Sequence, residues 1–413
     1  MHRGLAQATP HSLLDDARIV RQVELNLKRN TAQDASEAIE AAVAAYCLSD
    51  CRSSLWNPET FSLLWGTALW NEASPAQRVL LNQLYWVAYY SQIVSAEIAT
   101  IFLNHVAAVG LYAIEDFRPV CDNLDLETRQ ERVHIHAFKT IGEDFEHRLF
   151  GRRIFTYPMR HPFTETMIFA DSNRFRTWWK SVQLRAFTAM AGSPFLGSQY
   201  LLIRGLRTLN GKIVQHKLSQ FFANHAERER APIPAAISWH HFSDESFHFN
   251  TSRIVGLEVP RVLPAPSAFE RWVVNRGVAG CQLDHYHFSV AVNGIFWFDP
   301  ALFAATYLLL RSPSFALDHA GALRMLERCY CEDSDGVQAA ARTHAEAVES
   351  YRRFVEPVTW LSAANREMRH MAGNGVDRYL QTNRRAFARF QHRASALKDQ
   401  PQLAPADLAG SSA

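Results

Sequence analysis

The chain of 413 residues is long enough for one large domain or two, and its 48% hydrophobic content supports a substantial core. A formal net charge of +2 excludes the strongly basic or acidic balance that marks many partners of nucleic acid or of acidic proteins. The six cysteines include no C-x-x-C pair of a zinc site, and they are too few for a disulfide framework.

Targeting signals are not expected. Residues 1–16 lack the apolar region of a signal peptide. The most apolar stretch, 288–310, is interrupted by Asn-Gly and Asp-Pro pairs, so it does not predict a transmembrane helix. We therefore expect a cytoplasmic protein with no membrane and no nucleic-acid partner.

Residues 1–74 are expected to be a helical lead-in, loose and polar up to about residue 30. Ser74-Pro75 then predicts a helix start, with serine as N-cap and proline at the first helical position. The helix that follows, to about residue 111, is apolar on all sides, as is typical inside a bundle. Glu97 lies in its middle, where a carboxylate is costly unless it is paired or bound to a metal. The alternative is that Glu97 lies on a polar edge of this helix.

A second long helix is predicted from about residue 125 to 150. It carries Glu131 and His134, which share one helix face because they are three residues apart, and both can reach one ion. This helix is rich in charge, so the simpler alternative is that both side chains are solvated. A third long helix is predicted from 195 to about 225.

A fourth helix carries the most informative motif, His-x-x-x-Glu-x-x-His. At about 100° per residue, His241, Glu245 and His248 fall on one face of this helix. Two imidazoles and a carboxylate on one stripe are ligands that suit a transition metal. The alternative is a half-exposed helix whose histidines form local hydrogen bonds.

The C-terminal region, 253–400, is expected to hold further helices and one β-hairpin at about 283–298. Two β-rich runs flank Asn293-Gly294, which is a strong hairpin signal. His285 and His287 share one face of the first run. They could bind a metal together, or the run could be a plain surface strand. Small, polar residues at 401–413 predict a disordered tail.

Taken together, the candidate ligands come from three long helices, as in ferritin-like di-iron bundles. The predicted fold is therefore mainly α: a ferritin-like di-iron bundle at 75–252 with a C-terminal extension. The predicted metal ligands are Glu97, Glu131, His134, His241, Glu245 and His248.

Over residues 75–252 the sequence resembles the AurF-type di-iron N-oxygenases, whose pattern is Glu, Glu-x-x-His, Glu and His-x-x-x-Glu-x-x-His. The resemblance implies two iron ions, with Glu131 and Glu245 bridging or chelating, and O2 as co-substrate. It further implies N-oxygenation of an amine in a biosynthetic pathway and an external electron donor or reductase. The sequence leaves open whether the protein forms a homodimer. The substrate would approach beside aromatic residues, of which Tyr89, Tyr90, Phe138 and Phe242 are the candidates.

One position departs from that pattern. Alignment with the family places its third single glutamate at Gln199, which has no charge. Three carboxylates leave a net charge of about +1 on two ferrous ions, which is unfavourable in a bundle core unless hydroxide or substrate compensates. Either another carboxylate takes the place, with Glu165, Glu227 and Glu229 as candidates, or the second metal is held weakly.

Two alternatives to N-oxygenation remain from the sequence. The same site could hydroxylate a carbon of a biosynthetic intermediate, because the position of the substrate decides which atom is oxidised. The bundle could also be degenerate and bind one metal or none.

Overall fold

The computed structural model describes residues 16–112, 117–155, 178, 182, 192–284, 302–373 and 375–398. These residues form helices and contain no strand, so the prediction of a mainly α fold is confirmed. The β-hairpin expected at about 283–298 finds no support: residues 283 and 284 end a helix, and the rest lies outside the described residues. The predicted disordered tail, 401–413, also lies outside them.

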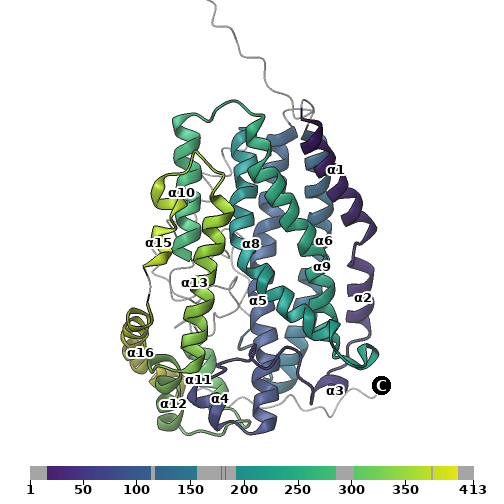
Figure 1. The fold of residues 1–413 in the computed structure, drawn as a ribbon. Helices are drawn as coiled ribbons and strands as arrows, with labels where there is room; N and C mark the ends of the chain where they lie inside the picture. The colour runs from purple at the N-terminus through teal and green to yellow at the C-terminus, as the bar shows by residue number, and fades with distance from the viewer. Residues whose placement is uncertain are drawn as a thin grey trace, which may run out of the picture.

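The helices follow one another along the chain as shown in Figure 1. Their bounds are α1 Ala17–Ala32, α2 Ser36–Ala44, α3 Leu48–Cys51, α4 Ala68–Glu72, α5 Pro75–Tyr112, α6 Arg118–Phe150, α8 Pro194–Ala223, η3 Arg228–Arg230, α9 Ile233–Leu257, η4 Val259–Arg261, α10 Ala268–Asp284, α11 Phe303–Arg311, α12 His319–Cys331, α13 Asp335–Val355, α14 Ala363–Arg366, α15 Arg369–Ala372 and α16 Val376–Lys398.

Four long helices, α5, α6, α8 and α9, form the centre of the molecule (Figure 1). The most extensive contacts are those of α8 with α9 and of α5 with α6. Each of these pairs is antiparallel. Between α5 and α6, Asn104 meets Thr128 whereas the later Ala108 meets the earlier Cys121. Between α8 and α9, Leu202 lies against Gly256 whereas the later Arg204 meets the earlier Ser252. The connection at 151–193 joins α6 to α8, which run in the same direction. One long crossover between parallel helices is a known way to build such a bundle.

Local signals in the sequence explain where the long helices begin and end. At the start of α5, the Ser74 hydroxyl accepts from the Gln77 amide and the Gln77 side chain accepts from the Ser74 amide, a reciprocal capping arrangement. Helix α6 ends at Gly151, whose φ of 67° lies in the left-handed region that favours glycine. The start of α6 at Arg118 is earlier than the predicted residue 125.

The segment up to residue 30 was expected to be loose, and from residue 17 on this is wrong. Helix α1 begins at Ala17 because the Asp16 carboxylate accepts from the amides of Arg18 and Ile19. Its apolar side chains Ile19 and Val23 are buried in the same core cluster as residues of α6 and α8. The polar residues that suggested a loose segment lie on the other face of an amphipathic helix.

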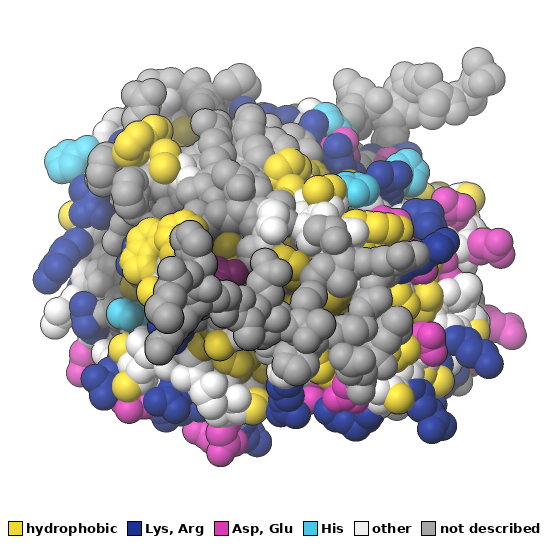
Figure 2. All heavy atoms as spheres, turned by 90° about the horizontal axis from the view of Figure 1, so that it is seen from above, with side chains coloured by type: hydrophobic (Ala, Val, Ile, Leu, Met, Phe, Trp, Pro, Cys, Tyr) yellow, Lys and Arg dark blue, Asp and Glu magenta, His cyan; other side chains and the backbone are white. Residues whose placement is uncertain are grey.

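Helix α5 is long and apolar enough to cross a membrane by length and composition alone. This is weak evidence, because the core helix of a soluble protein passes the same test. In the structure α5 packs against α6 and α8. Seen end-on, charged side chains lie around the rim of the described surface and apolar ones show mainly toward its middle (Figure 2).

Candidate metal centre

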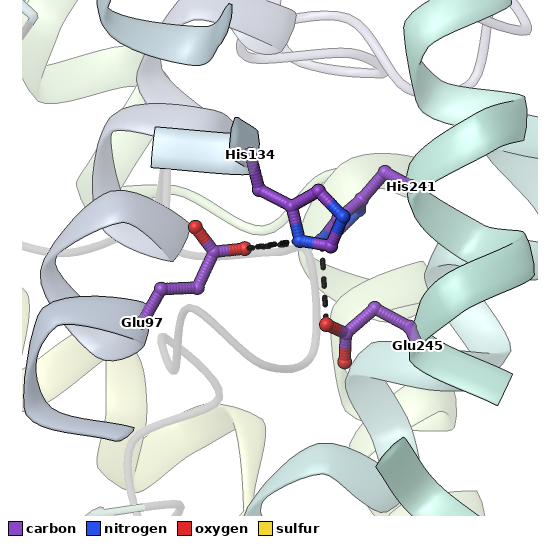
Figure 3. A group of neighbouring side chains, drawn as sticks. All are labelled: Glu97, His134, His241 and Glu245. Atoms are coloured by element: carbon purple, nitrogen blue, oxygen red, sulfur yellow. Dashed lines mark hydrogen bonds and ion pairs between the residues drawn. The ribbon is translucent and has the colours of Figure 1, made fainter. Parts of the chain in front are cut away.

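The side chains of the predicted ligands meet in the middle of the bundle. Ligand atoms of one group, and separately of a second, lie within 4.8 Å of one another, and Glu245 belongs to both. Figure 3 shows the four side chains of the first group pointing toward one another. The first group is Glu97, His134, His241 and Glu245, and the second is Glu131, Glu245 and His248. Helices α5, α6 and α9 thus supply two adjoining sets of donor atoms.

In the first group, the imidazoles face carboxylate oxygens from two sides. The His241 Nε2 atom lies 3.1 Å from Glu97 Oε1 and 3.6 Å from Glu245 Oε1. The His134 Nδ1 atom lies 3.7 Å from Glu97 Oε1. The same nitrogen is 3.4 Å from Glu131 Oε2, which links the first group to the second.

In the second group, His248 Nδ1 lies 2.9 Å from Glu245 Oε1 and 3.4 Å from Glu131 Oε1. Glu131 therefore has one oxygen toward His134 and the other toward His248. Glu131 and Glu245 occupy the space between the two groups, which is where a carboxylate that bridges two ions must lie.

Burial makes the ionisation of this cluster unusual. Burial, and then the charge of Glu131, raise the pKa of Glu97 well above its usual range. Burial also acts to raise the pKa of Glu131, but the charges of His248 and His134 and the hydrogen bonds with both together outweigh it and hold that pKa at about 2. Burial acts to raise the pKa of Glu245 as well, but the charge and the hydrogen bond of His248, together with His241, outweigh it and lower that pKa. The carboxylates thus need nearby positive charge to stay ionised.

The histidines divide in a complementary way. Burial acts to lower the pKa of His134 and His248, but their acidic neighbours raise both pKa values well above the usual range. The pKa of His241 is lowered well below its usual range by burial, then by the charge on His134. Protons on His134 and His248 therefore supply the positive charge that a bound cation would supply in their place.

One orphaned atom tests whether this donor set fits a metal. Within the part of the chain that the structure describes, Glu97 Oε2 is buried and has no hydrogen-bond partner. Buried polar atoms without partners are rare in proteins and call for an explanation such as an ion. Imidazole and carboxylate donors suit iron and similar transition metals. The residues present therefore fit an iron site.

The far sides of two of the imidazoles are also held. His134 Nε2 lies 3.0 Å from Asp244 Oδ2, and His248 Nε2 lies 2.9 Å from Gln130 Oε1. The arrangement is reciprocal: Asp244 is the α9 residue before Glu245, and Gln130 is the α6 residue before Glu131. Partners of this kind fix the tautomer and the orientation of a ligating imidazole, with Nδ1 left free for the metal.

The N-terminal helices anchor both of these partners. The Asn30 side chain at the end of α1 donates to Gln130 Oε1 and accepts from Gln130 Nε2, at 3.1 and 2.9 Å. The backbone amide of Ala35, just before α2, donates to Asp244 Oδ1 at 3.1 Å. The lead-in therefore forms part of the support of the cluster.

Sequence reasoning missed Asp244 and Gln130. Each of them directly precedes a Glu-x-x-His pair in the sequence, and this position could have identified them. A residue one position earlier on a helix points about 100° away from the metal face, here toward the neighbouring helix. The spacing alone does not say which histidine each one meets, because that depends on how α6 and α9 pair.

We expect Asp244→Asn to weaken ferrous iron binding by about 10–100-fold, because an amide cannot accept from His134 as strongly as a carboxylate does. A titration of the metal-free protein with ferrous iron measures this. The matched control is Asp125→Asn on the exposed face of α6. An affinity for Asp244→Asn equal to that of the control would show that Asp244 does not orient a ligand.

Gln199 does not reach the cluster. Its side chain donates to the Gly256 carbonyl at 3.1 Å and accepts from Trp360 Nε1 at 2.8 Å. Arg204, further along α8, is the residue level with Glu127, which precedes Glu131 by one helical turn. Alignment with the N-oxygenases therefore placed the expected ligand about three turns too early on α8. Of the substitute carboxylates, Glu227 pairs with Arg230 on the surface and Glu165 lies outside the described residues.

No other residue of α8 can replace the missing carboxylate, because this helix contains neither aspartate nor glutamate. Since α6 and α8 run in the same direction and Arg204 meets Glu127, the turn from Thr208 to Gly211 lies level with Glu131 and His134. Among the described residues, the side of the cluster that faces α8 therefore has no acidic ligand.

One turn from the cluster, Arg204 forms a buried network. Its guanidinium donates to Glu127 Oε2 at 2.7 Å, to Asn104 Oδ1 at 2.9 Å and to the His248 carbonyl at 3.0 Å. Arg204 Nε also donates to the Ser252 hydroxyl at 2.8 Å. A single side chain of α8 thereby joins α5, α6 and α9 next to His248.

The comparisons with known proteins place this geometry in a family. Over residues 18–391 the chain matches the model of a family described as acyl halogenase CylC-like. The chain belongs to this family. No curated protein and no solved structure matches the chain. Membership makes the chain an iron-dependent biosynthetic enzyme of the oxygenase or halogenase type.

The family match corrects one prediction. The resemblance to AurF-type N-oxygenases is wrong as an assignment of family, because the matching family is the CylC-like one. The misassignment has a physical reason. The paired Glu-x-x-His spacing indicates only that two antiparallel helices can bind a metal between them. Different enzyme families need such a site, so the spacing does not distinguish them.

Proposed function

We propose that this chain binds two iron ions in its ferritin-like bundle and uses O2 to halogenate a carbon atom of an acyl substrate. The observation that carries the proposal is the missing acidic ligand on α8 in a chain of the acyl halogenase family. Three carboxylates against two ferrous ions leave a net charge of about +1 in a buried site. A halide ion has the charge and the small size to compensate on the open side.

Each residue has a role in this proposal. Glu97 and His241 would hold one ion, Glu131 and His248 would hold the other, and Glu245 could contribute to both. His134 belongs to the first group, and Asp244 holds its ring in place. When bound, two ferrous ions supply the electrons that reduce O2 and hence the oxidising power of the reaction.

The site offers two further features that this chemistry needs. The rings of Tyr90 and Phe138 pack beside the His241 ring, with centroid distances of 5.6 and 5.0 Å, and both are buried. They exclude water on that side, which protects a reactive centre from side reactions. Toward α8, none of the residues of that helix is acidic, so this face supplies no negative charge to a bound cation.

The proposal is tested by product analysis. Protein loaded with ferrous iron is supplied with O2, a reductant, chloride and a panel of acyl substrates. We expect a chlorinated product by mass spectrometry, and its brominated counterpart when bromide replaces chloride. A hydroxylated product at every halide concentration would instead support the carbon hydroxylase. The Glu245→Ala variant serves as the control without a complete site.

A further inference from the structure

A continuous row of aromatic rings leads away from the cluster on the side of α5. The His241 ring contacts Tyr90, and Tyr90 contacts Trp86 with a centroid distance of 4.7 Å. Trp86 in turn contacts Trp56 at 5.7 Å, edge to face. Phe138 stacks on Tyr90 with a centroid distance of 4.1 Å, and its ring also contacts the His241 ring. All of these rings are buried.

The row ends close to the surface at α3. The Trp56 indole donates to the Cys51 carbonyl at 3.1 Å. Cys51 is buried, whereas Cys47, one helical turn earlier, is exposed. Rings in mutual contact therefore connect His241 of the cluster with Trp56 at α3.

Two of these rings are indoles, which are among the most easily oxidised side chains, and their hydrogen bonds share one property. Trp86 Nε1 donates to the Pro234 carbonyl and to the Ser238 hydroxyl, at 3.1 and 3.0 Å. Trp56 Nε1 donates to a carbonyl as well. These acceptors are neutral and weakly basic, so an indole that loses an electron keeps its proton. The electron can then return without a proton having to be recovered.

We propose that Trp86 and Trp56 form an electron relay between an external one-electron donor that docks near α3 and the iron centre. This rests on the proposed function, because an O2-dependent iron enzyme needs such a donor. In each passage Trp86 would give one electron to an iron centre that O2 has oxidised, Trp56 would give one to Trp86, and the donor would give one to Trp56. The iron centre is reduced by one electron, the donor is oxidised by one, and both indoles end unchanged. Tyr90 and Phe138 carry the contact from Trp86 to His241.

The exposed thiol of Cys47 allows a direct test, because the other cysteines of the described chain are buried. A ruthenium photo-oxidant is attached to Cys47 of ferrous-loaded protein without O2, halide or substrate. A flash with a diffusible quencher then withdraws one electron at α3. We expect ferric iron to form, as measured by electron paramagnetic resonance. In metal-free protein the absorption of the indole radical cation should appear instead, so the relay is tested even if the iron assignment fails.

Matched variants decide the outcome. Trp86→Phe and Trp56→Phe should each lower the yield of ferric iron by about tenfold, the effect of an added barrier of about 1.4 kcal/mol. Trp272→Phe makes the same change at an exposed site on α10 and should also have no effect. Variants are compared only after each is shown to fold and to bind iron as wild type does. Equal ferric yields in Trp86→Phe, Trp56→Phe and Trp272→Phe would overturn the relay.

Discussion

Replacing Glu245 by alanine should remove most of the bound iron and abolish activity. Glu245 belongs to both groups of donor atoms, whereas His241 belongs to one. His241→Ala should therefore lose mainly one ion, and Glu245→Ala should lose both. Changes to residues that only orient ligands already lower metal affinity 10–100-fold, so loss of a shared ligand should cost more than about tenfold at either ion.

Iron analysis of the purified variants measures this, with His136→Ala as the control. His136 lies on the same helix as His134 but is exposed, so its removal should leave the iron content unchanged. Wild-type iron content in both Glu245→Ala and His241→Ala would contradict the ligand assignment. A loss of both ions from His241→Ala would show that the two groups do not bind independently.

Arg204→Met should lower the free energy of unfolding of the metal-free protein by about 3–5 kcal/mol, the usual cost of leaving one partner of a buried pair without the other. The exposed fractions of the Arg204 and Glu127 side chains are 5% and 0%, so water cannot compensate for the lost contact. The change also removes the hydrogen bonds that Arg204 donates to Asn104 and to the His248 carbonyl.

Urea denaturation measures the free energy of unfolding of Arg204→Met, and two further variants serve for comparison. In Arg204→Met/Glu127→Leu the orphaned carboxylate is gone, so much of the lost stability should return. Arg18→Met breaks the pair with Glu258 on the surface, where the Arg18 side chain is 54% exposed, and should change the stability far less than Arg204→Met does. If Arg204→Met were as mild as Arg18→Met, the buried network would not stabilise the bundle.

The features that sequence predicted well depend on spacing within one helix. The apolar run after Ser74-Pro75 became α5, and the motif at His241, Glu245 and His248 placed three side chains on one face of α9. A helix has a fixed rotation per residue, so such faces can be derived from the sequence alone.

The features that sequence missed depend on how helices pair. Gln199 was matched to a ligand position through its apolar neighbours, but α8 is apolar along much of its length, so several alignments fit almost equally well. Only the contacts of Arg204 with α6 and α9 fix which turn of α8 faces the cluster. The crossed contacts from Asp244 to His134 and from Gln130 to His248 likewise appear only once α6 and α9 are placed side by side.

The central claim is that the buried cluster binds two iron ions. The most direct test is the iron content of the protein reconstituted with ferrous iron in the absence of oxygen and freed of excess metal. The two adjoining groups that share Glu245 predict two iron ions per chain. One ion per chain would mean that the side without an α8 carboxylate does not hold metal, and none would mean that protons on His134 and His248 are the natural counter-charge. Either result would contradict the account.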